Sequence, residues 1–317
     1  MKRLVDGILS SLIIVTLIVL SLVLCPFSLS DNQKDTMLIL LIICGSSALY
    51  CFIVGEITRN NSQMDKLWSI LPIAYTWVIA AKAGFNPRQV IYAVLVTLWG
   101  IRLTFNFARK GAYSIKFWSG EEDYRWTILR SKSPLDKKFV WAMFDLFFIS
   151  IYQNILVLGI CLPSLASMDS LEPLGVVDYI AFGGAILFLI LETVSDEIQM
   201  SFHKEKKRLL KEGKTLFELP SPYNKGFNTL GIWNYSRHPN YLGEQGFWLM
   251  LYLIVVNAGV TTYGVFSWSA IGPLLLVFIF LGSSNLQENI SMKKYPEYSD
   301  YVNRVNKYIP IRKYRKD

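Results

Sequence analysis

Residues Val176 to Met200 read VVDYIAFGGAILFLILETVSDEIQM, and the architecture of the chain can be inferred outward from this segment. Its apolar part approaches the roughly 20 helical residues needed to cross the hydrocarbon core of a bilayer. Its end carries Glu192, Asp196 and Gln199, and His203 follows. Steps of four, three and four residues place these side chains on one face of a helix. The segment therefore predicts a membrane helix with an ionisable stripe at one end.

Further apolar blocks of similar length flank this one on both sides. By hydropathy they cover roughly residues 4–24, 37–55, 67–83, 90–108, 139–161, 241–258 and 263–282. Hydrophobic residues make up 52% of the 317 positions and the mean hydropathy is +0.34, which exceeds the usual balance of a soluble domain. We expect an all-α, polytopic transmembrane helical bundle of about eight spans, or seven if one of the last two blocks is re-entrant.

The distribution of lysine and arginine tests this topology independently, because short cytosolic loops carry an excess of both. Nearly all of the 32 basic residues fall in alternate loops, and the other loops hold only Lys34, Lys82 and Arg88. An even number of spans then places both termini in the cytoplasm. The net charge of +8 follows from this topology, and no nucleic-acid motif accompanies it. We therefore expect membrane lipids, and no nucleic acid, as partners.

We expect one membrane domain over residues 1–317, without internal repeats. Residues 1–64 contain two N-terminal spans, and the first is expected to be a retained anchor because no cleavage site follows it. A core covers residues 65–310. The main polar segments, all expected on the cytosolic side, are the loops 109–138 and 202–240 and the tail 284–317. The sequence fits either a bacterial inner membrane or the endoplasmic reticulum, and it leaves the oligomeric state open.

No metal site or disulfide is expected. The four cysteines lie in or beside apolar blocks without metal-ligand spacing, so they are interpreted as small apolar residues. The two histidines, His203 and His238, are separated by a polar loop and do not form a convincing metal site.

Residues Gly231 to Glu244 read GIWNYSRHPNYLGE and combine cationic, imidazole, amide, phenol and carboxylate groups at the mouth of a predicted helix. Pro239 suits the first turn of a helix, where free backbone N–H groups beside Arg237 and His238 would attract a phosphate or a carboxylate. Asn240, Tyr241 and Glu244 follow within the first turns. The alternative is a capped helix start with an interfacial aromatic belt.

Other polar residues stand at the predicted helix ends. Arg102 lies about two turns inside its block, where it would snorkel to the interface or pair with an acid or a phosphate. Asp65 precedes another block and could be a helix N-cap. Arg125 belongs to an acidic and aromatic loop segment, Glu121 to Trp126.

Taken in order, these fragments resemble the steroid 5-alpha-reductase-like membrane reductases, including the uncharacterised bacterial-type members. The resemblance covers about residues 65 to 310. It rests on Asp65-x-x-Trp68, Trp99-Gly100-x-Arg102-Leu103, Asp123-x-Arg125-Trp126, Glu192-x-x-x-Asp196-x-x-Gln199, Gly231-x-Trp233, Ser236-Arg237-His238-Pro239-Asn240-Tyr241-x-Gly243-Glu244 and Lys294-Tyr295-Pro296-x-Tyr298.

This resemblance implies a helical membrane reductase that uses NADPH to reduce a carbon–carbon double bond, in an enone or a related alkene, of a lipid-soluble, sterol-like or other lipid substrate. The cofactor would lie on the cytoplasmic side. By motif position, the resemblance assigns to the cofactor pocket or its rim Arg102, Arg125, Glu192, Asp196, Gln199, Arg237, His238, Asn240, Tyr241, Glu244 and Tyr298. NADPH is implied by the resemblance alone, because the chain lacks a dinucleotide-binding Gly-x-Gly-x-x-Gly fingerprint after a strand.

Hydride transfer to an enone leaves negative charge on the carbonyl oxygen, so the reaction needs a hydrogen-bond donor and a proton there. The steroid reductases that the chain resembles use an acid and a tyrosine, and Asp65 corresponds to the acid. Trp99 stands at the position of the tyrosine and cannot protonate an oxyanion in the same way. Tyr92 and Tyr241 are the candidate replacements.

Two other functions remain open at this stage. The Arg-His-Pro-x-Tyr pattern is similar to that of isoprenylcysteine carboxyl methyltransferases, which implies a membrane methyltransferase using S-adenosylmethionine. A lipid-binding or transport protein without enzymatic activity would also place ionisable groups inside the membrane.

Overall fold

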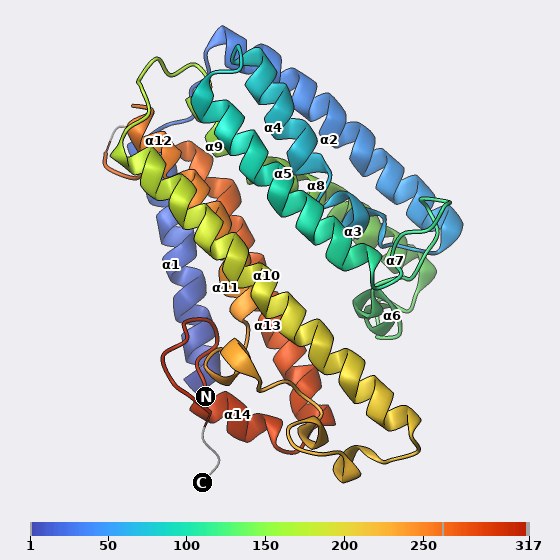
Figure 1. The fold of residues 1–317 in the computed structure, drawn as a ribbon. Coiled ribbons are helices and arrows are strands. Elements are labelled where there is room, and N and C mark those ends of the chain that lie inside the picture. The colour runs from blue at the N-terminus through green and yellow to red at the C-terminus, as the bar shows by residue number, and fades with distance from the viewer. Residues whose placement is uncertain (1, 262, 315–317) are drawn as a thin grey trace. The chain divides into compact units, whose positions relative to one another are not determined.

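The computed structural model describes residues 2–261 and 263–314, and every regular element in these ranges is helical apart from two isolated β-bridges. This confirms the predicted all-α class (Figure 1). The helices are α1 (Lys2–Leu24), α2 (Asp31–Thr58), α3 (Gln63–Leu67), α4 (Leu71–Lys82), α5 (Pro87–Ala108), α6 (Tyr124–Arg130), α7 (Lys138–Phe144), the π-helix η1 (Asp145–Tyr152), α8 (Gln153–Gly159), α9 (Leu162–Ser167), α10 (Val176–Lys211), the 3₁₀ turns η2 (Leu216–Glu218), η3 (Tyr223–Lys225) and η4 (Gly231–Asn234), α11 (Pro239–Tyr252), α12 (Ile254–Asn257), the 3₁₀ turn η5 (Trp268–Ala270), α13 (Ile271–Lys294) and α14 (Tyr298–Arg304).

Among the described residues, six helical segments are long and apolar enough to cross a membrane. They are Gly7–Leu24, Asp31–Thr58, Pro87–Ala108, Lys138–Ser167, Val176–Lys211 and Trp268–Lys294. A multi-pass membrane protein is therefore consistent with both the sequence and the helix lengths.

The other two apolar blocks form shorter helices. Helix α4 has 12 residues and α11 has 14, which correspond to about 18 and 21 Å of helix, against a hydrocarbon core of about 30 Å. Apolar character in α11 continues past its end at Tyr252, but the backbone breaks at Leu253 before the short α12. The expected total of eight spans and the orientation of the termini stay predictions.

The chain divides into two compact units. One contains residues 2–11, 183–249 and 277–314, and we call it the motif unit because it holds the Arg-His-Pro-Asn-Tyr segment. The other contains Leu12–Phe182 and Met250–Leu276, and we call it the scaffold unit. Each unit is described by itself below.

Small residues set the helix packing of the scaffold unit. A Cβ atom added to Gly100 on α5 would lie 2.5 Å from the carbonyl oxygen of Ser69, so α4 and α5 approach closely as antiparallel neighbours (Figure 1). A Cβ on Gly159 of α8 would lie 3.2 Å from the Cα of Gly272 at the start of α13. Glycine is required at both crossings because any side chain would push the backbones apart.

A buried ion pair fastens the scaffold unit where α5 and α10 begin. Arg88 donates from Nε to Oδ1 of Asp178 at 2.9 Å and from its terminal nitrogen NH2 to Oδ2 at 3.1 Å. The two side chains are 3% and 0% exposed. Asn257 and the backbone N–H of Gly175 also donate to Asp178, at 2.5 and 3.0 Å, so the carboxylate is well satisfied.

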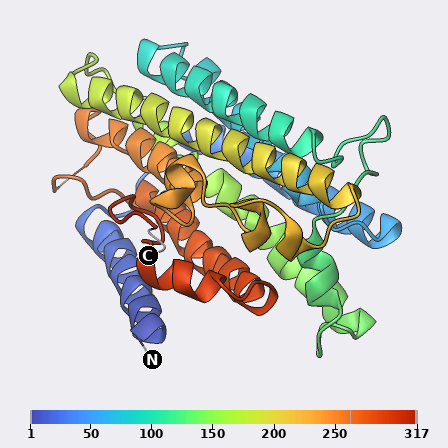
Figure 2. The same cartoon turned by 60° about the horizontal axis from the view of Figure 1, so that its bottom comes forward.

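In the motif unit, the C-terminal part of α10 packs against α11, and α14 crosses the end of α13 (Figure 2). A hydrophobic cluster holds the tail in place. Its buried members are Phe227, Tyr298, Tyr301, Val302, Val305 and Tyr314. The loop after α10 and the end of the chain therefore share one core.

Candidate functional site

The polar stripe of α10 meets α11 directly. The Nδ2 group of Asn240, in the first turn of α11, donates to Asp196 at 3.1 Å. The approach is close because Gly243 faces Glu192: a Cβ atom on that glycine would lie 2.5 Å from the Glu192 Cβ. Glu192 itself is 4% exposed at this crossing. Two fragments from distant parts of the sequence are thus joined at one place.

The stripe continues towards the loop that follows α10. Gln199 and His203 contact each other at 3.0 Å through their side-chain nitrogen atoms, and Asn228 donates to the Gln199 oxygen at 2.9 Å. Asn228 is buried, and its own oxygen accepts from the backbone N–H of Leu230. The spacing of the stripe predicted the shared face, whereas the contribution of Asn228 had no signal in the sequence.

Tyr241 is oriented by α13. Gln287 donates from Nε2 to the Tyr241 hydroxyl at 2.5 Å, and the Tyr241 ring meets Phe280 edge-on with centroids 4.6 Å apart. The His238 ring stacks on Tyr241 at 5.3 Å. Gln287, Phe280 and His238 thus fix the position of the Tyr241 side chain.

Arg237 is directed at α13 and the tail. Its Nε lies 2.7 Å from Oε1 of Glu288, and NH1 donates to the backbone carbonyls of Val302 and Val305. The backbone N–H of Arg237 also donates to Asn306 at 3.0 Å. The guanidinium is 8% exposed and Glu288 4%. A phosphate ligand was expected here, but the structure gives Arg237 an internal counter-ion and a role in positioning the tail.

His238 shares the same carboxylate. Its Nε2 lies 3.1 Å from Oε1 of Glu288, and its backbone N–H donates to Lys307 at 2.9 Å. Burial lowers the pKa of the imidazole below its usual 6.5, and the hydrogen bond to Glu288 opposes that shift only in part. Glu288 was not predicted as a site residue, because the sequence does not reveal that an acid about fifty positions away faces Arg237.

The remaining expected residues of the motif unit have packing contacts. Glu244 is 4% exposed and accepts from Trp248 Nε1 at 3.2 Å. Tyr298 was expected near the rim of a cofactor pocket, but it is buried against Phe227 and Tyr301, with ring centroids 5.0 and 5.7 Å away. Its role in the structure is to hold the tail.

In the scaffold unit, Asp65 lies on α3 against helix α6. Trp126 Nε1 donates to Asp65 Oδ2 at 2.7 Å, and Arg125 lies 3.6 Å from Oδ1 while pairing with Asp123 at 2.8 Å. Burial raises the pKa of the Asp65 carboxyl above its usual value, and the Arg125 guanidinium offsets part of that shift. The N-cap expectation for Asp65 is wrong, because Asp65 lies inside α3, whose N-cap is Ser62, and the N-cap of α4 is Ile70. A largely buried carboxyl with a raised pKa is suited to proton transfer.

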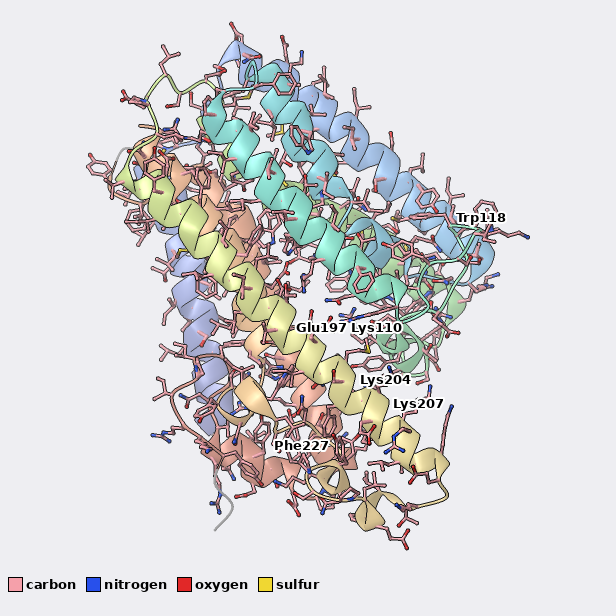
Figure 3. All side chains as sticks on the ribbon, in the orientation of Figure 1. Lys110, Trp118, Glu197, Lys204, Lys207 and Phe227 are labelled. Carbon is pink, nitrogen blue, oxygen red and sulfur yellow. The ribbon has the colours of Figure 1, made fainter. Side chains whose placement is uncertain are left out.

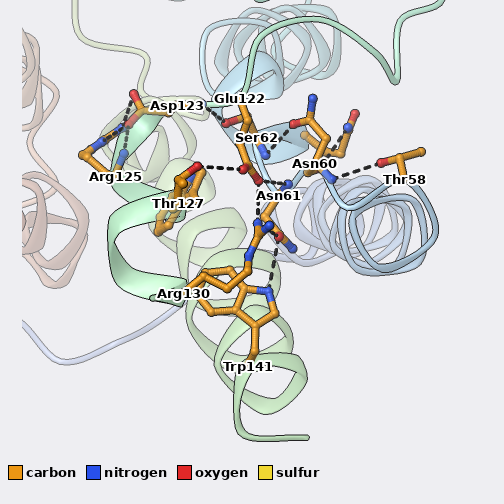
Figure 4. A network of polar contacts seen from close by, with 12 residues as sticks. Thr58, Asn60, Asn61, Ser62, Glu122, Asp123, Arg125, Thr127, Arg130 and Trp141 are labelled. Carbon is orange, nitrogen blue, oxygen red and sulfur yellow. Dashed lines mark hydrogen bonds and ion pairs between the residues drawn. The ribbon is translucent and has the colours of Figure 1, made fainter. Parts of the chain in front are cut away.

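A polar network joins the residues just before α3 to the segment around Glu122 and to α6 (Figure 4). Glu122 accepts from the backbone N–H of Asn61 at 2.8 Å, and Arg130 donates to both residues at 2.7 Å. Trp141 Nε1 also donates to Asn61, at 3.2 Å, and Ser62 accepts from the backbone of Asp123 at 2.9 Å. The segment Glu121 to Trp126 is thus anchored in the fold.

Tyr92 lies in the core of the scaffold unit. It is fully buried, and its hydroxyl lies 3.5 Å from the carbonyl oxygen of Ile160. Arg102 is half-buried near the end of α5, and Trp99 is fully buried.

The long apolar helices and the polar contacts on α10 and α11 define a polytopic helical membrane protein with a candidate ligand site at its helix ends. The chain belongs to the family described as protein of unknown function DUF1295, which matches residues 51–305. It is 34% identical over 280 residues to the uncharacterized protein C594.04c of Schizosaccharomyces pombe, covering 83% of this chain and 78% of that protein. No solved structure matches the chain significantly.

Proposed function

We propose that the protein is an NADPH-dependent membrane reductase that acts on a carbon–carbon double bond, in an enone or related alkene, of a lipophilic substrate. The observation that carries the proposal is the Asn240–Asp196 contact, because it joins two of the fragments that resemble the membrane reductases. The extension of this polar group through Gln199 and Asn228 supports it further.

The side chains present suit a nicotinamide nucleotide. Carboxylates such as Asp196 accept hydrogen bonds from ribose hydroxyls, and amides such as Asn240 and Gln199 pair with a carboxamide. The Oδ1 atom of Asn240 is buried and accepts no hydrogen bond within residues 2–261 and 263–314, so a ligand donor that reached it would satisfy an unpaired acceptor. Arg237 would act through the tail and not as a phosphate ligand, since Glu288 neutralises it.

NADPH, when bound, supplies a hydride. The chain must supply a proton and stabilise a developing oxyanion. Tyr241 is the proposed donor in the motif unit, because a phenol can donate a proton and Gln287 and His238 fix its position. Asp65 is the proposed acid in the scaffold unit, where burial keeps its pKa raised. Tyr92 has a less suitable position, since its hydroxyl faces a backbone carbonyl in the core.

The test is to measure NADPH binding to the purified full-length protein by calorimetry. Asp196→Ala is expected to weaken binding by roughly tenfold or more, since it removes a charged hydrogen-bond acceptor. Asp136→Ala is the matched control, because Asp136 is exposed in a loop of the scaffold unit. Both variants should keep the melting temperature of the wild type.

Binding of S-adenosylmethionine in place of NADPH would replace the reductase with a methyltransferase. Absence of binding to either cofactor would favour a lipid-binding or transport protein. An Asp196→Ala variant that binds NADPH as tightly as the Asp136→Ala control would remove the assigned site.

A further inference from the structure

A groove of about 960 Å³ runs along the last part of α10. One wall is the helix itself, and the opposite wall comes from the loop that follows it, including Tyr223, Leu230 and Gly231. The groove lies on a different helical face from Asp196 and Gln199, since its lining residues Glu197, Ser201 and Lys204 are offset from that stripe. Lys207, four residues after His203, lies where the groove borders that stripe.

Among the charged residues that line this groove, basic side chains outnumber acidic ones. Lys204, Lys207, Arg208 and Lys211 contribute to it, against two acids, Glu197 and Glu205. Figure 3 shows Glu197, Lys204 and Lys207 in sequence along α10.

One of the two acids is neutralised within the helix. Arg208 pairs with Glu205 and with Glu212, both at 2.7 Å. The structure records no acidic partner for Lys204, Lys207 or Lys211 in the part of the chain that it describes. These three exposed ammonium groups lie on successive turns of one helix, so together they favour an anion carrying more than one charge.

The groove also has an apolar side. The rings of Phe202 and Tyr223 stack with centroids 5.2 Å apart and an interplanar angle of 21°, and Leu230 lies beside them. Cationic groups next to an aromatic and aliphatic wall suit a ligand that joins a phosphate to a less polar part, such as a glycerol ester or a nucleoside.

Its position along α10 places the groove at a membrane surface. The helix has 36 residues, or about 54 Å of rise, and about 30 Å of this crosses hydrocarbon. Counted from Val176, roughly 20 helical residues of about 1.5 Å rise reach Asp196, so we expect the groove to lie in the headgroup layer and the water beyond it.

We propose that this groove is a phosphate-binding site that takes either the headgroup of an anionic phospholipid or the phosphates of a nucleotide. If the ligand is a phospholipid, this site is independent of the proposed reductase function. If the ligand is a nucleotide, the inference rests on the proposed function, and the groove would supply the phosphate contacts that Arg237 does not.

The experiment uses the full-length protein in a neutral detergent. It is titrated with dihexanoylphosphatidic acid and with NADP⁺, and dihexanoylphosphatidylcholine serves as the zwitterionic comparison. The test variant is Lys204→Gln/Lys207→Gln/Lys211→Gln. The control is Lys132→Gln/Lys137→Gln/Lys138→Gln, which removes the same charge from exposed positions of the scaffold unit.

The test variant is expected to bind one phosphate probe roughly tenfold or more weakly than the wild type, and added salt should weaken wild-type binding of that probe. The control variant should bind as the wild type does. If the test variant loses affinity for phosphatidic acid alone, the groove is a lipid site, and this conclusion holds even if NADP⁺ does not bind at all. Loss confined to NADP⁺ identifies a nucleotide site.

Wild-type affinity of the test variant for both probes would overturn the proposal, and so would a wild type that binds neither probe. All three lysines are exposed, so the melting temperature without ligand should not change. If the triple variant does not fold, Lys207→Gln alone is tested by the same criterion, with Lys137→Gln as its control.

Discussion

The Arg88–Asp178 pair in the scaffold unit allows a quantitative prediction. Replacing Arg88 by methionine keeps a long side chain but removes the charge, so Asp178 is left as a buried carboxylate with only neutral donors. The pair is 3% and 0% exposed, and its two hydrogen bonds measure 2.9 and 3.1 Å. Removing one partner from a buried pair costs about 3–5 kcal/mol, because the remaining charge is not compensated.

That cost should be visible in thermal unfolding of the protein in detergent. At roughly 2–4 °C per kcal/mol for a folded unit of this size, Arg88→Met is expected to lower the melting temperature by roughly 6 to 20 °C. The matched control is Lys34→Met, which breaks the pair between Lys34 and Asp31 in the same unit. Those side chains are 62% and 98% exposed, so no change in melting temperature is expected from the control.

A second variant separates charge burial from loss of packing. Arg88→Met/Asp178→Asn removes both charges but retains an oxygen that can accept from Gly175 and Asn257. It should recover much of the lost stability. The explanation is wrong if Arg88→Met has the same melting temperature as the wild type, or if the double variant is no more stable than Arg88→Met.

Two further predictions concern the motif unit. Gly243→Ala should lower the free energy of unfolding by about 1–3 kcal/mol and weaken NADPH binding, because the new Cβ would lie 2.5 Å from that of Glu192 and force α10 and α11 apart. The control is Gly282→Ala, where a Cβ would have no neighbour within 4 Å, and it should change neither the melting temperature nor the affinity for NADPH. The pKa of His238 in the folded protein lies below its usual 6.5, so His238 binds a proton more readily in the unfolded chain than in the folded one. The stability that comes from keeping His238 neutral is therefore complete above pH 6.5 and is lost as the pH falls. The melting temperature of the wild type should therefore drop more between about pH 7.5 and 5.5 than that of His238→Gln, and equal slopes would contradict this assignment.

The sequence predicted the helical class and most helix positions, because bilayer-spanning helices require continuous apolar runs. It did not predict that α4 and α11 would be short, since hydropathy does not report a backbone break such as the one at Leu253. The helical period also placed Glu192, Asp196 and Gln199 on one face, which the continuous α10 confirms.

The partners of the polar residues were harder to predict. Arg237 was expected at a ligand, and the structure pairs it with Glu288, because only the three-dimensional fold brings α13 and the tail to that position. The sequence does not distinguish a rim position from a core position for Tyr298, because an aromatic residue in a basic tail has the same pattern in both cases, and the structure places it in the core. Spacing within one helix is encoded locally, whereas contacts between helices are not.

The attachment of Arg237 to Val302 and Val305 has a consequence for biosynthesis. These carbonyl partners follow Arg237 in the chain by 65 and 68 positions. The Arg-His-Pro-Asn-Tyr segment is translated earlier and cannot complete its contacts until Val302 and Val305 have emerged. Maturation of this region is therefore expected to wait for synthesis of Val302 and Val305, and a premature stop codon before Val302 would leave Arg237 without these contacts.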